Sequence, residues 1–454
     1  MTLHGPPPKA FAERRAAVRA ALDGAVLFLP ETPEAVYAND VHYTYRPDTN
    51  VRYLSGFEEP CALLLSNHGK EEDGFTLCVR ARDEKSETWT GKRAGVEGAR
   101  ETYGADHAFP IEETWAVLLR QLRRADRLFY AHSRDPHVNQ RVLELVHEAN
   151  AERPRRGGDP IVVSEATALL AEFRLHKRPE EIDRMREAGR ISAAAHMRLM
   201  ETLRPGQTEY QAQALLEYEF RYGGCTGPAY GSICAGGANA TVLHYTSNDR
   251  ALADGELLLV DAAGEYGGYC ADITRTFPVG ASFSAGQAEL YDIALAAQEA
   301  SIEAVRPGIA IEEVHRTALR VLVEGLISIG LLTGTVDECI ERNAYTPFYM
   351  HNTSHWLGMD VHDAGSYRTS GSSRVLEEGM VLTVEPGLYV RSDLLVDEKF
   401  RGVGIRIEDD ILVTAGGREI MTSDVIKGRG EIEKIRKRAL AAKPSAAKPL
   451  AAKA

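Results

Sequence analysis

Apolar segments in the first 170 residues have the lengths and spacing of mixed helices and strands. Glu112–Arg124 has the spacing of an amphipathic helix, and Lys9–Leu22 is a second predicted helix. Short apolar runs predict buried strands at Ala25–Leu29, Cys61–Ser66 and Phe75–Val79. This mixture predicts that the chain begins with one α/β domain.

The rest of the chain has a different pattern, with two long helical segments. Glu180–Leu203 and Ala285–Val305 both have helical spacing, and each runs into the phrase RPG and a second helical segment. Two such helix pairs, each followed by strands, suggest an internal duplication. We therefore expect a first domain at 1–174 and a second domain at 175–438.

Strands of the second domain are rich in β-branched and apolar residues, yet a carboxylate interrupts or follows each of them. These carboxylates belong to Asp261, Asp272, Glu385 and Glu408. The strands are expected at Leu257–Asp261, Ala271–Val279, Met380–Val384 and Gly404–Val413.

Such carboxylates are costly in a core unless they are protonated, paired with a base or bound to a metal. One acid alone could equally be a paired structural residue. The strands carry too few bases to neutralise all four acids: Arg406 is the clear candidate and Arg275 is the second. A hairpin that turns at Glu265–Tyr269 would bring two of the acids together.

Histidines cluster in the segment HNTSHWLGMDVHD, at His351, His355 and His362. A lone histidine here would more often be a core residue with a satisfied hydrogen bond. Three histidines near four acids instead form a mixed oxygen and nitrogen donor set, which suits Mn²⁺, Co²⁺ or Zn²⁺. Four carboxylates and one imidazole can hold two divalent ions, which together bind a hydroxide and polarise a carbonyl.

Composition narrows the partners and the cellular compartment that fit this chain. The net charge of −13 argues against nucleic acid as a partner, because binding phosphate requires a basic surface. No apolar run is long enough to span a membrane, and the N-terminus lacks the apolar core of a signal peptide. Six scattered cysteines without a CxxC pair suggest reduced thiols and a cytoplasmic protein. The Ala-, Lys- and Pro-rich tail, 439–454, is expected to be disordered.

The segments VDAAGEYGGYCADITRTFPVG, HNTSHWLGMDVHD, GMVLTVEPGLYV and GVGIRIEDDILVT resemble the aminopeptidase P family of metallopeptidases. YRPDTNVRYLSGFEEPCALLL resembles the first domain of that family, so the resemblance covers nearly the whole chain except the tail. It implies an α/β (α+β) architecture, in which an N-terminal α/β domain precedes a C-terminal pita-bread domain with pseudo-twofold duplication.

The resemblance also implies a ligand set and a reaction. Two divalent ions, usually Mn²⁺ with Co²⁺ or Zn²⁺ as alternatives, would bind to Asp261, Asp272, His355, Glu385 and Glu408. Members of the family release the N-terminal residue from peptides with proline at the second position, by attack of a hydroxide that bridges the metals. In this chain Asp272 and Glu408 would bridge the ions, and Glu385 would also act as the general base.

Further roles follow from the same resemblance. His362 would hydrogen-bond to the scissile carbonyl oxygen or the tetrahedral intermediate, and His244 and His351 would line the substrate site. His244 would also be a catalytic residue, together with Glu385 and His362. Arg406 would pair with the Asp261 side of the metal site, together with Tyr389.

Three more residues are candidates for substrate binding, and the first of them is Tyr389. Trp89 matches an aromatic residue that reaches a neighbouring subunit's active site in tetrameric relatives. Arg374 matches a position that could hold a C-terminal carboxylate. Relatives lead us to expect a homodimer or a homotetramer.

Rival interpretations share the same fold. A prolidase would cleave only Xaa-Pro dipeptides, and Arg374 does not discriminate because it could serve either enzyme. The N-terminal segments favour the aminopeptidase, and they disfavour methionine aminopeptidase, which needs no such domain. A non-enzymatic peptide-binding protein or a metal-free, creatinase-like hydrolase is disfavoured because all five ligands are present.

Overall fold

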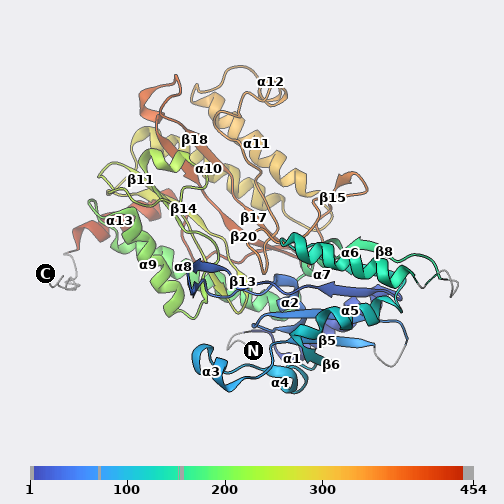
Figure 1. The fold of residues 1–454 in the computed structure, drawn as a ribbon. Helices are drawn as coiled ribbons and strands as arrows, with labels where there is room; N and C mark the ends of the chain where they lie inside the picture. The colour runs from blue at the N-terminus through green and yellow to red at the C-terminus, as the bar shows by residue number, and fades with distance from the viewer. Residues whose placement is uncertain (1–4, 70–72, 152, 154–157, 443–454) are drawn as a thin grey trace. The chain divides into compact units, whose positions relative to one another are not determined.

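A computed structural model describes residues 5–69, 73–151, 153 and 158–442 (Figure 1). The chain forms two compact units, residues 1–174 and residues 175–454. Each unit has its own sheets and its own apolar core, and each is described by itself.

The first unit is built around one mixed six-stranded sheet with the order β6-β5-β4-β1-β7-β8. The β1–β4 and β4–β5 pairs are antiparallel, whereas the pairs with β6, β7 and β8 are parallel. A separate exposed hairpin is formed by β2 and β3. The strands are β1 Val26–Leu29, β2 Val36–Ala38, β3 Val41–His42, β4 Cys61–Ser66, β5 Gly74–Val79, β6 His107–Pro110, β7 Arg127–Tyr130 and β8 Val162–Glu165.

Helices of this unit supply the apolar side chains that cover the sheet. Val117, Leu118 and Leu122 of α5 pack with Phe28 and Leu64 of the sheet, so the predicted amphipathic helix has its apolar face inward. The helices are α1 Pro8–Leu22, α2 Thr49–Ser55, α3 Glu84–Thr90, α4 Gly95–Glu101, the 3₁₀ turn η1 Ile111–Glu113, α5 Thr114–Leu122, α6 Pro136–Ala151 and α7 Ala166–Leu175.

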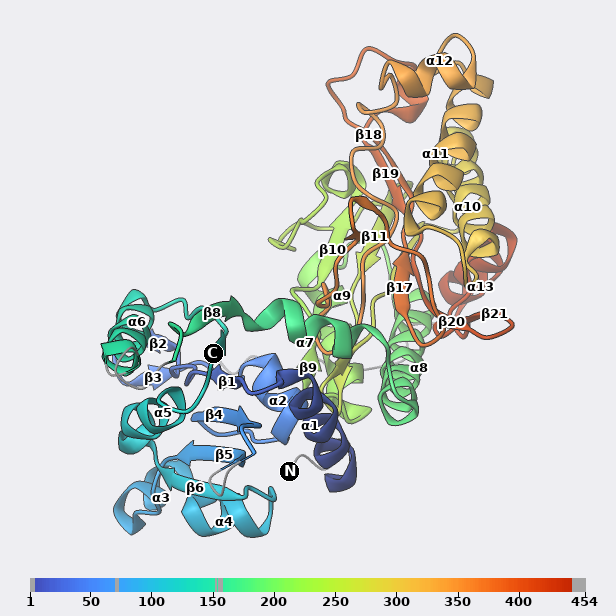
Figure 2. The ribbon, with the colours of Figure 1, turned by 90° about the vertical axis from the view of Figure 1, so that its right-hand side faces the viewer.

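The second unit contains two helix pairs, α8 with α9 and α10 with α11, as the sequence predicts. Figure 2 shows α10 and α11 side by side next to the strands of this unit. Pro179 at the first position and two glutamates in the first turn start α8. The helices are α8 Pro179–Thr202, α9 Glu209–Tyr222, the 3₁₀ turn η3 Gly237–Thr241, α10 Ala285–Ala304, α11 Ile311–Ser328, α12 Val336–Glu341, the 3₁₀ turn η4 Glu398–Phe400 and α13 Arg429–Ala441.

Strands follow each helix pair and form small antiparallel sheets, including β10-β11-β14, β13-β12-β9, β17-β20-β21 and β18-β19. Two clusters of buried apolar side chains lie between these sheets and the helices. The strands are β9 Gly227–Pro228, β10 Ile233–Gly236, β11 Leu257–Asp261, β12 Gly264–Tyr266, β13 Tyr269–Cys270, β14 Thr274–Pro278, β15 Arg368–Thr369, β16 Ser372–Ser373, β17 Val381–Val384, β18 Gly387–Val390, β19 Val403–Arg406, β20 Asp409–Thr414 and β21 Gly417–Ile420.

The predicted hairpin between the first two acids is present. β12 pairs with β13 across Gly267 and Gly268, both of which have positive φ, as the tight turn of a two-residue hairpin requires. The prediction for the following strand was wrong at its start, because β14 begins at Thr274 and Asp272 precedes it. The Asp272 N–H donates to the Asp410 carboxylate at 3.0 Å instead of to a neighbouring strand.

The predicted single strand Gly404–Val413 was also wrong, since it is divided into β19 and β20. β19 pairs with β18, and β20 pairs with β17, so the chain changes partners at Ile407 and Glu408. The buried side chains of Glu408, Asp409 and Asp410 each contact different groups, namely Thr274, Arg275 and the Asp272 N–H.

Other expectations concern the chain ends and the cysteines. α13 extends to Ala441, so its last three residues lie in the range assigned to the tail, and residues 443–454 lie outside the described residues. The limits of the two domains stay a prediction. All six cysteines are buried and free of disulfides. Among the described helices, none combines the length and apolar character needed to cross a membrane.

Candidate active site

A cavity of about 710 Å³ in the second unit is lined by all five predicted metal ligands. His244, His351, His362 and Arg406 also line it. The sequence therefore identified most of the titratable side chains that this cavity brings together, from segments more than 160 positions apart. The five predicted ligands are Asp261, Asp272, His355, Glu385 and Glu408.

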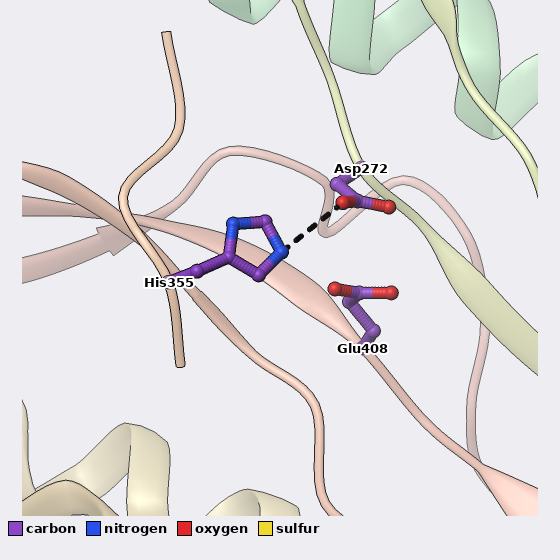
Figure 3. A group of neighbouring side chains, drawn as sticks. All are labelled: Asp272, His355 and Glu408. Atoms are coloured by element: carbon purple, nitrogen blue, oxygen red, sulfur yellow. Dashed lines mark ion pairs between the residues drawn. The ribbon is translucent and has the colours of Figure 1, made fainter. Parts of the chain in front are cut away.

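Three of these residues converge most closely. Asp272, His355 and Glu408 each have one ligand atom within 4.8 Å of the others, and Figure 3 shows the three side chains pointing toward one another. His355 Nε2 lies 3.4 Å from an Asp272 oxygen and 3.7 Å from a Glu385 oxygen. His355 Nδ1 is 3.0 Å from the Trp356 carbonyl oxygen, so that nitrogen can donate while Nε2 remains directed at the carboxylates.

Backbone pairing sets the positions of these side chains. The Thr383 N–H donates to the His355 carbonyl, and the Glu385 N–H donates to the Thr353 carbonyl. The segment from Thr353 to Leu357 therefore runs antiparallel to β17 and begins beside Glu385. Similarly, Asp261 pairs with Thr274 between β11 and β14, and the Glu408 N–H donates to the Thr274 carbonyl.

Electrostatics at this cluster favour an added cation. Burial, together with the neighbouring carboxylates, raises the pKa of Asp272, raises that of Glu385 to about 7 and raises that of Glu408 well above its usual value. Burial lowers the pKa of His355, but Asp272 and Glu385 outweigh it and raise this pKa to about 9. Buried carboxylates that repel one another, with an imidazole nitrogen beside them, form a donor set that fits a divalent cation.

Arg406 compensates one of the four acids directly. Its Nη2 donates to Asp261 at 2.5 Å and its Nη1 donates to the Tyr389 hydroxyl at 3.1 Å. The same hydroxyl lies 2.8 Å from His351 Nε2, so Tyr389 links Arg406 and His351, both of which line the cavity, in one continuous polar chain. This arrangement agrees with the pairing expected for Arg406 and Tyr389.

Arg275, the second base considered for the four acids, has a different partner. It donates to Asp409 at 2.7 Å, and both side chains are almost completely buried. Its guanidinium also donates to the carbonyl oxygens of Glu408, Val425 and Ile426. Arg275 thus fixes the backbone that carries Glu408, whereas the Glu408 carboxylate accepts from the Thr274 hydroxyl at 2.6 Å.

Tyr230 is a residue of this site that the sequence did not indicate. Its hydroxyl oxygen lies 2.7 Å from an Asp261 carboxylate oxygen and 2.5 Å from an Asp272 carboxylate oxygen, so the two acids share its single proton. His315, Tyr367 and Arg368 also line the cavity and were not predicted. An aromatic or basic residue in a loop or on a helix has many ordinary roles, so no spacing or strand interruption marked these positions.

The remaining predicted residues occupy different environments. The rings of His362 and His355 meet edge to face, with centroids 4.5 Å apart, and His362 therefore lies beside the carboxylate cluster. Arg374 is not among the lining residues, and its backbone pairs with Ile311 and Tyr367. Trp89 lies on α3 of the first unit and is 84% exposed. The roles of Arg374 and Trp89 stay predictions.

Comparisons with known proteins agree with this geometry. Residues 183–415 match the model of metallopeptidase family M24, and residues 11–130 match the N-terminal domain of aminopeptidase P. The chain belongs to metallopeptidase family M24. Among curated relatives, the Xaa-Pro aminopeptidase of Escherichia coli K12 is 41% identical over 426 residues, which cover 92% of this chain and 95% of the relative.

Solved structures show the same fold. Pseudomonas aeruginosa aminopeptidase PepP matches with a TM-score of 0.92 and 43% identity, covering 96% of this chain and all of that chain. Zinc-substituted E. coli aminopeptidase P in complex with product matches with a TM-score of 0.91 and 40% identity, covering 96% and 99% of the two chains. The pita-bread fold and the family resemblance predicted from the sequence are therefore confirmed.

Proposed function

We propose that this enzyme is a metal-dependent Xaa-Pro aminopeptidase, which releases the N-terminal residue from peptides with proline at the second position. The convergence of four carboxylates and His355 on one cavity carries the proposal. Curated Xaa-Pro aminopeptidases that are similar along nearly the whole chain support the choice of substrate.

The metal would be held by Asp261, Asp272, His355, Glu385 and Glu408, and we propose two ions, with Mn²⁺ as the first candidate. When bound, divalent ions in such a site lower the pKa of a water molecule and polarise a peptide carbonyl. The zinc-substituted relative supports a divalent ion with flexible identity.

The side chains of this protein would carry the proton transfers and orient the substrate. Glu385 would accept a proton from the attacking water and pass it to the proline nitrogen that leaves. His362, at the cavity wall, would donate a hydrogen bond to the carbonyl oxygen as negative charge develops there. His244 and His351 would contact the peptide from the same cavity.

Removing the metal tests the proposal. Protein stripped with a chelator should lose hydrolysis of an Xaa-Pro-Yaa tripeptide, because the buried carboxylates alone cannot activate water at neutral pH. Refilling with Mn²⁺, Co²⁺ or Zn²⁺ should restore it, as measured by release of the N-terminal amino acid. Equal cleavage before and after chelation would contradict the proposal. Cleavage of the Xaa-Pro dipeptide alone would identify a prolidase instead.

Substitution of His362 separates binding from catalysis. His362→Ala should lower kcat by about 10²-fold or more, the range for loss of a donor to a developing oxyanion. Its ring lies beside His355, but it is not one of the five proposed ligands, so metal content should stay near that of the unmodified protein. Elemental analysis alongside steady-state kinetics measures both. Loss of metal in this variant would place His362 among the ligands.

We further propose a cytoplasmic protein, which six reduced and buried cysteines support. A homodimer or homotetramer is proposed from the family resemblance, and the exposed Trp89 would then reach a neighbouring subunit.

A further inference from the structure

The segment that carries His244 has little regular structure of its own. Between β10 and β11 the chain forms only the short turn η3, and no helix or strand is present at residues 242–250. Yet Leu243, His244 and Thr246 line the cavity. Something outside this segment must therefore fix the position of His244.

A buried carboxylate from α9 binds both ends of the segment. Glu209 is fully buried, and its Oε1 accepts from the Gly236 N–H at 2.8 Å and from Asn239 Nδ2 at 3.0 Å. Its Oε2 accepts from the Tyr245 hydroxyl at 2.8 Å and from the Arg250 N–H at 2.9 Å. Four donors spread from Gly236 to Arg250 thus converge on one carboxylate, and one of them, Tyr245, directly follows His244 in the chain.

The next turn of the same helix supplies a second attachment. Gln213 Oε1 accepts from Asn248 Nδ2 at 2.9 Å, and Gln213 Nε2 donates to Glu217 at 2.8 Å. Asn248 is buried and has a left-handed φ of 47°. Its side chain also donates to the Ser232 carbonyl and accepts from the Cys234 N–H, at the start of β10. Residues 209, 213 and 217 are spaced four apart, so they share one face of α9; Glu209 and Gln213 bind Tyr245, Asn248 and Arg250 of the loop, and Glu217 accepts from Ser232.

We propose that Glu209 is a positioning residue for His244, acting through Tyr245 and through the two ends of the loop. The inference rests on the proposed peptidase function, in which His244 contacts the peptide. A carboxylate suits this task because it offers acceptors only, and all four partners are donors. A glutamine would place an NH₂ group against two of those donors and could not satisfy them.

A double-mutant cycle tests this coupling. Tyr245→Phe removes one hydrogen bond to a charged acceptor, and we expect it to lower kcat/KM for an Xaa-Pro-Yaa tripeptide about tenfold. In the His244→Ala background the same change should have almost no effect, since the residue that it positions is gone. Tyr222→Phe is the matched control. Tyr222 is 79% exposed and lies on α9, the helix that carries Glu209, so this variant should retain full activity.

Hydrogen exchange provides a second readout that does not depend on activity. In Glu209→Gln, amides of residues 242–250 should exchange at least about tenfold faster than in the unmodified metal-loaded protein, while amides of β11 should be unchanged. Equal exchange in the loop, or an equal loss from Tyr245→Phe with and without His244, would overturn the positioning role. If the unmodified protein fails to cleave the tripeptide, the proposed function fails, and the exchange result alone decides whether Glu209 orders the loop.

Discussion

Glu385→Ala is expected to lower kcat by about 10⁴-fold or more, the upper end of what a positioned acid–base group contributes. Glu385 follows β17 directly, and its carboxylate lies 3.7 Å from His355 Nε2 and 3.9 Å from His351 Nδ1. Alanine would remove a proposed ligand and the proposed base together. The other acids that line the cavity are the three remaining proposed ligands and Glu312, whose carboxylate accepts from Arg316 at 2.9 Å. Single-turnover and steady-state kinetics on a tripeptide measure the loss.

A matched substitution shows whether the effect belongs to the site. Glu378 is an exposed glutamate seven positions earlier, and Glu378→Ala should leave kcat unchanged. Metal content of both variants, measured by elemental analysis, separates loss of ligand from loss of base. Full turnover in Glu385→Ala would refute its assignment as the base, whatever amount of metal the variant binds.

The carboxylate cluster could be predicted from sequence because a charged group inside an apolar strand violates the ordinary rule for cores. Asp261, Glu385 and Glu408 were recognisable on that ground, and all of them line the cavity. Asp272 was recognised too, although it precedes its strand. The violation marks a residue even when the limits of the strand are misplaced by a few positions.

Residues that obey the ordinary rules could not be found in this way. Tyr230 looks like a common loop aromatic, and only the fold shows its hydroxyl between two acids. Glu209 starts a helix, where an acid is expected for its interaction with the helix dipole, so its burial and four donors are invisible in the sequence. The partner of Arg275 was likewise hidden, because Asp409 lies next to a more conspicuous acid.

Breaking the buried Arg275–Asp409 ion pair is expected to have the largest effect on stability. Arg275→Met should lower the free energy of unfolding of the metal-loaded protein by about 3 kcal/mol or more, as for a buried ion pair that loses one member. The substitution leaves Asp409 buried with Lys427 as its remaining ion-pair partner, and it removes the donors to the carbonyls of Glu408, Val425 and Ile426. Denaturant unfolding followed by circular dichroism measures the change.

Arg429→Met is the matched control for this prediction, because the same substitution breaks an ion pair that is exposed to solvent. Arg429 binds Asp292 through two hydrogen bonds, with 38% and 51% of the side chains exposed, and such pairs contribute about 0–1 kcal/mol. Equal losses of unfolding free energy in the two variants would contradict the prediction that the buried ion pair contributes more to stability than the exposed one. Because Arg275 also fixes the backbone of Glu408, its loss should lower metal affinity, which the control should leave unchanged; metal titration of both folded variants would show this difference.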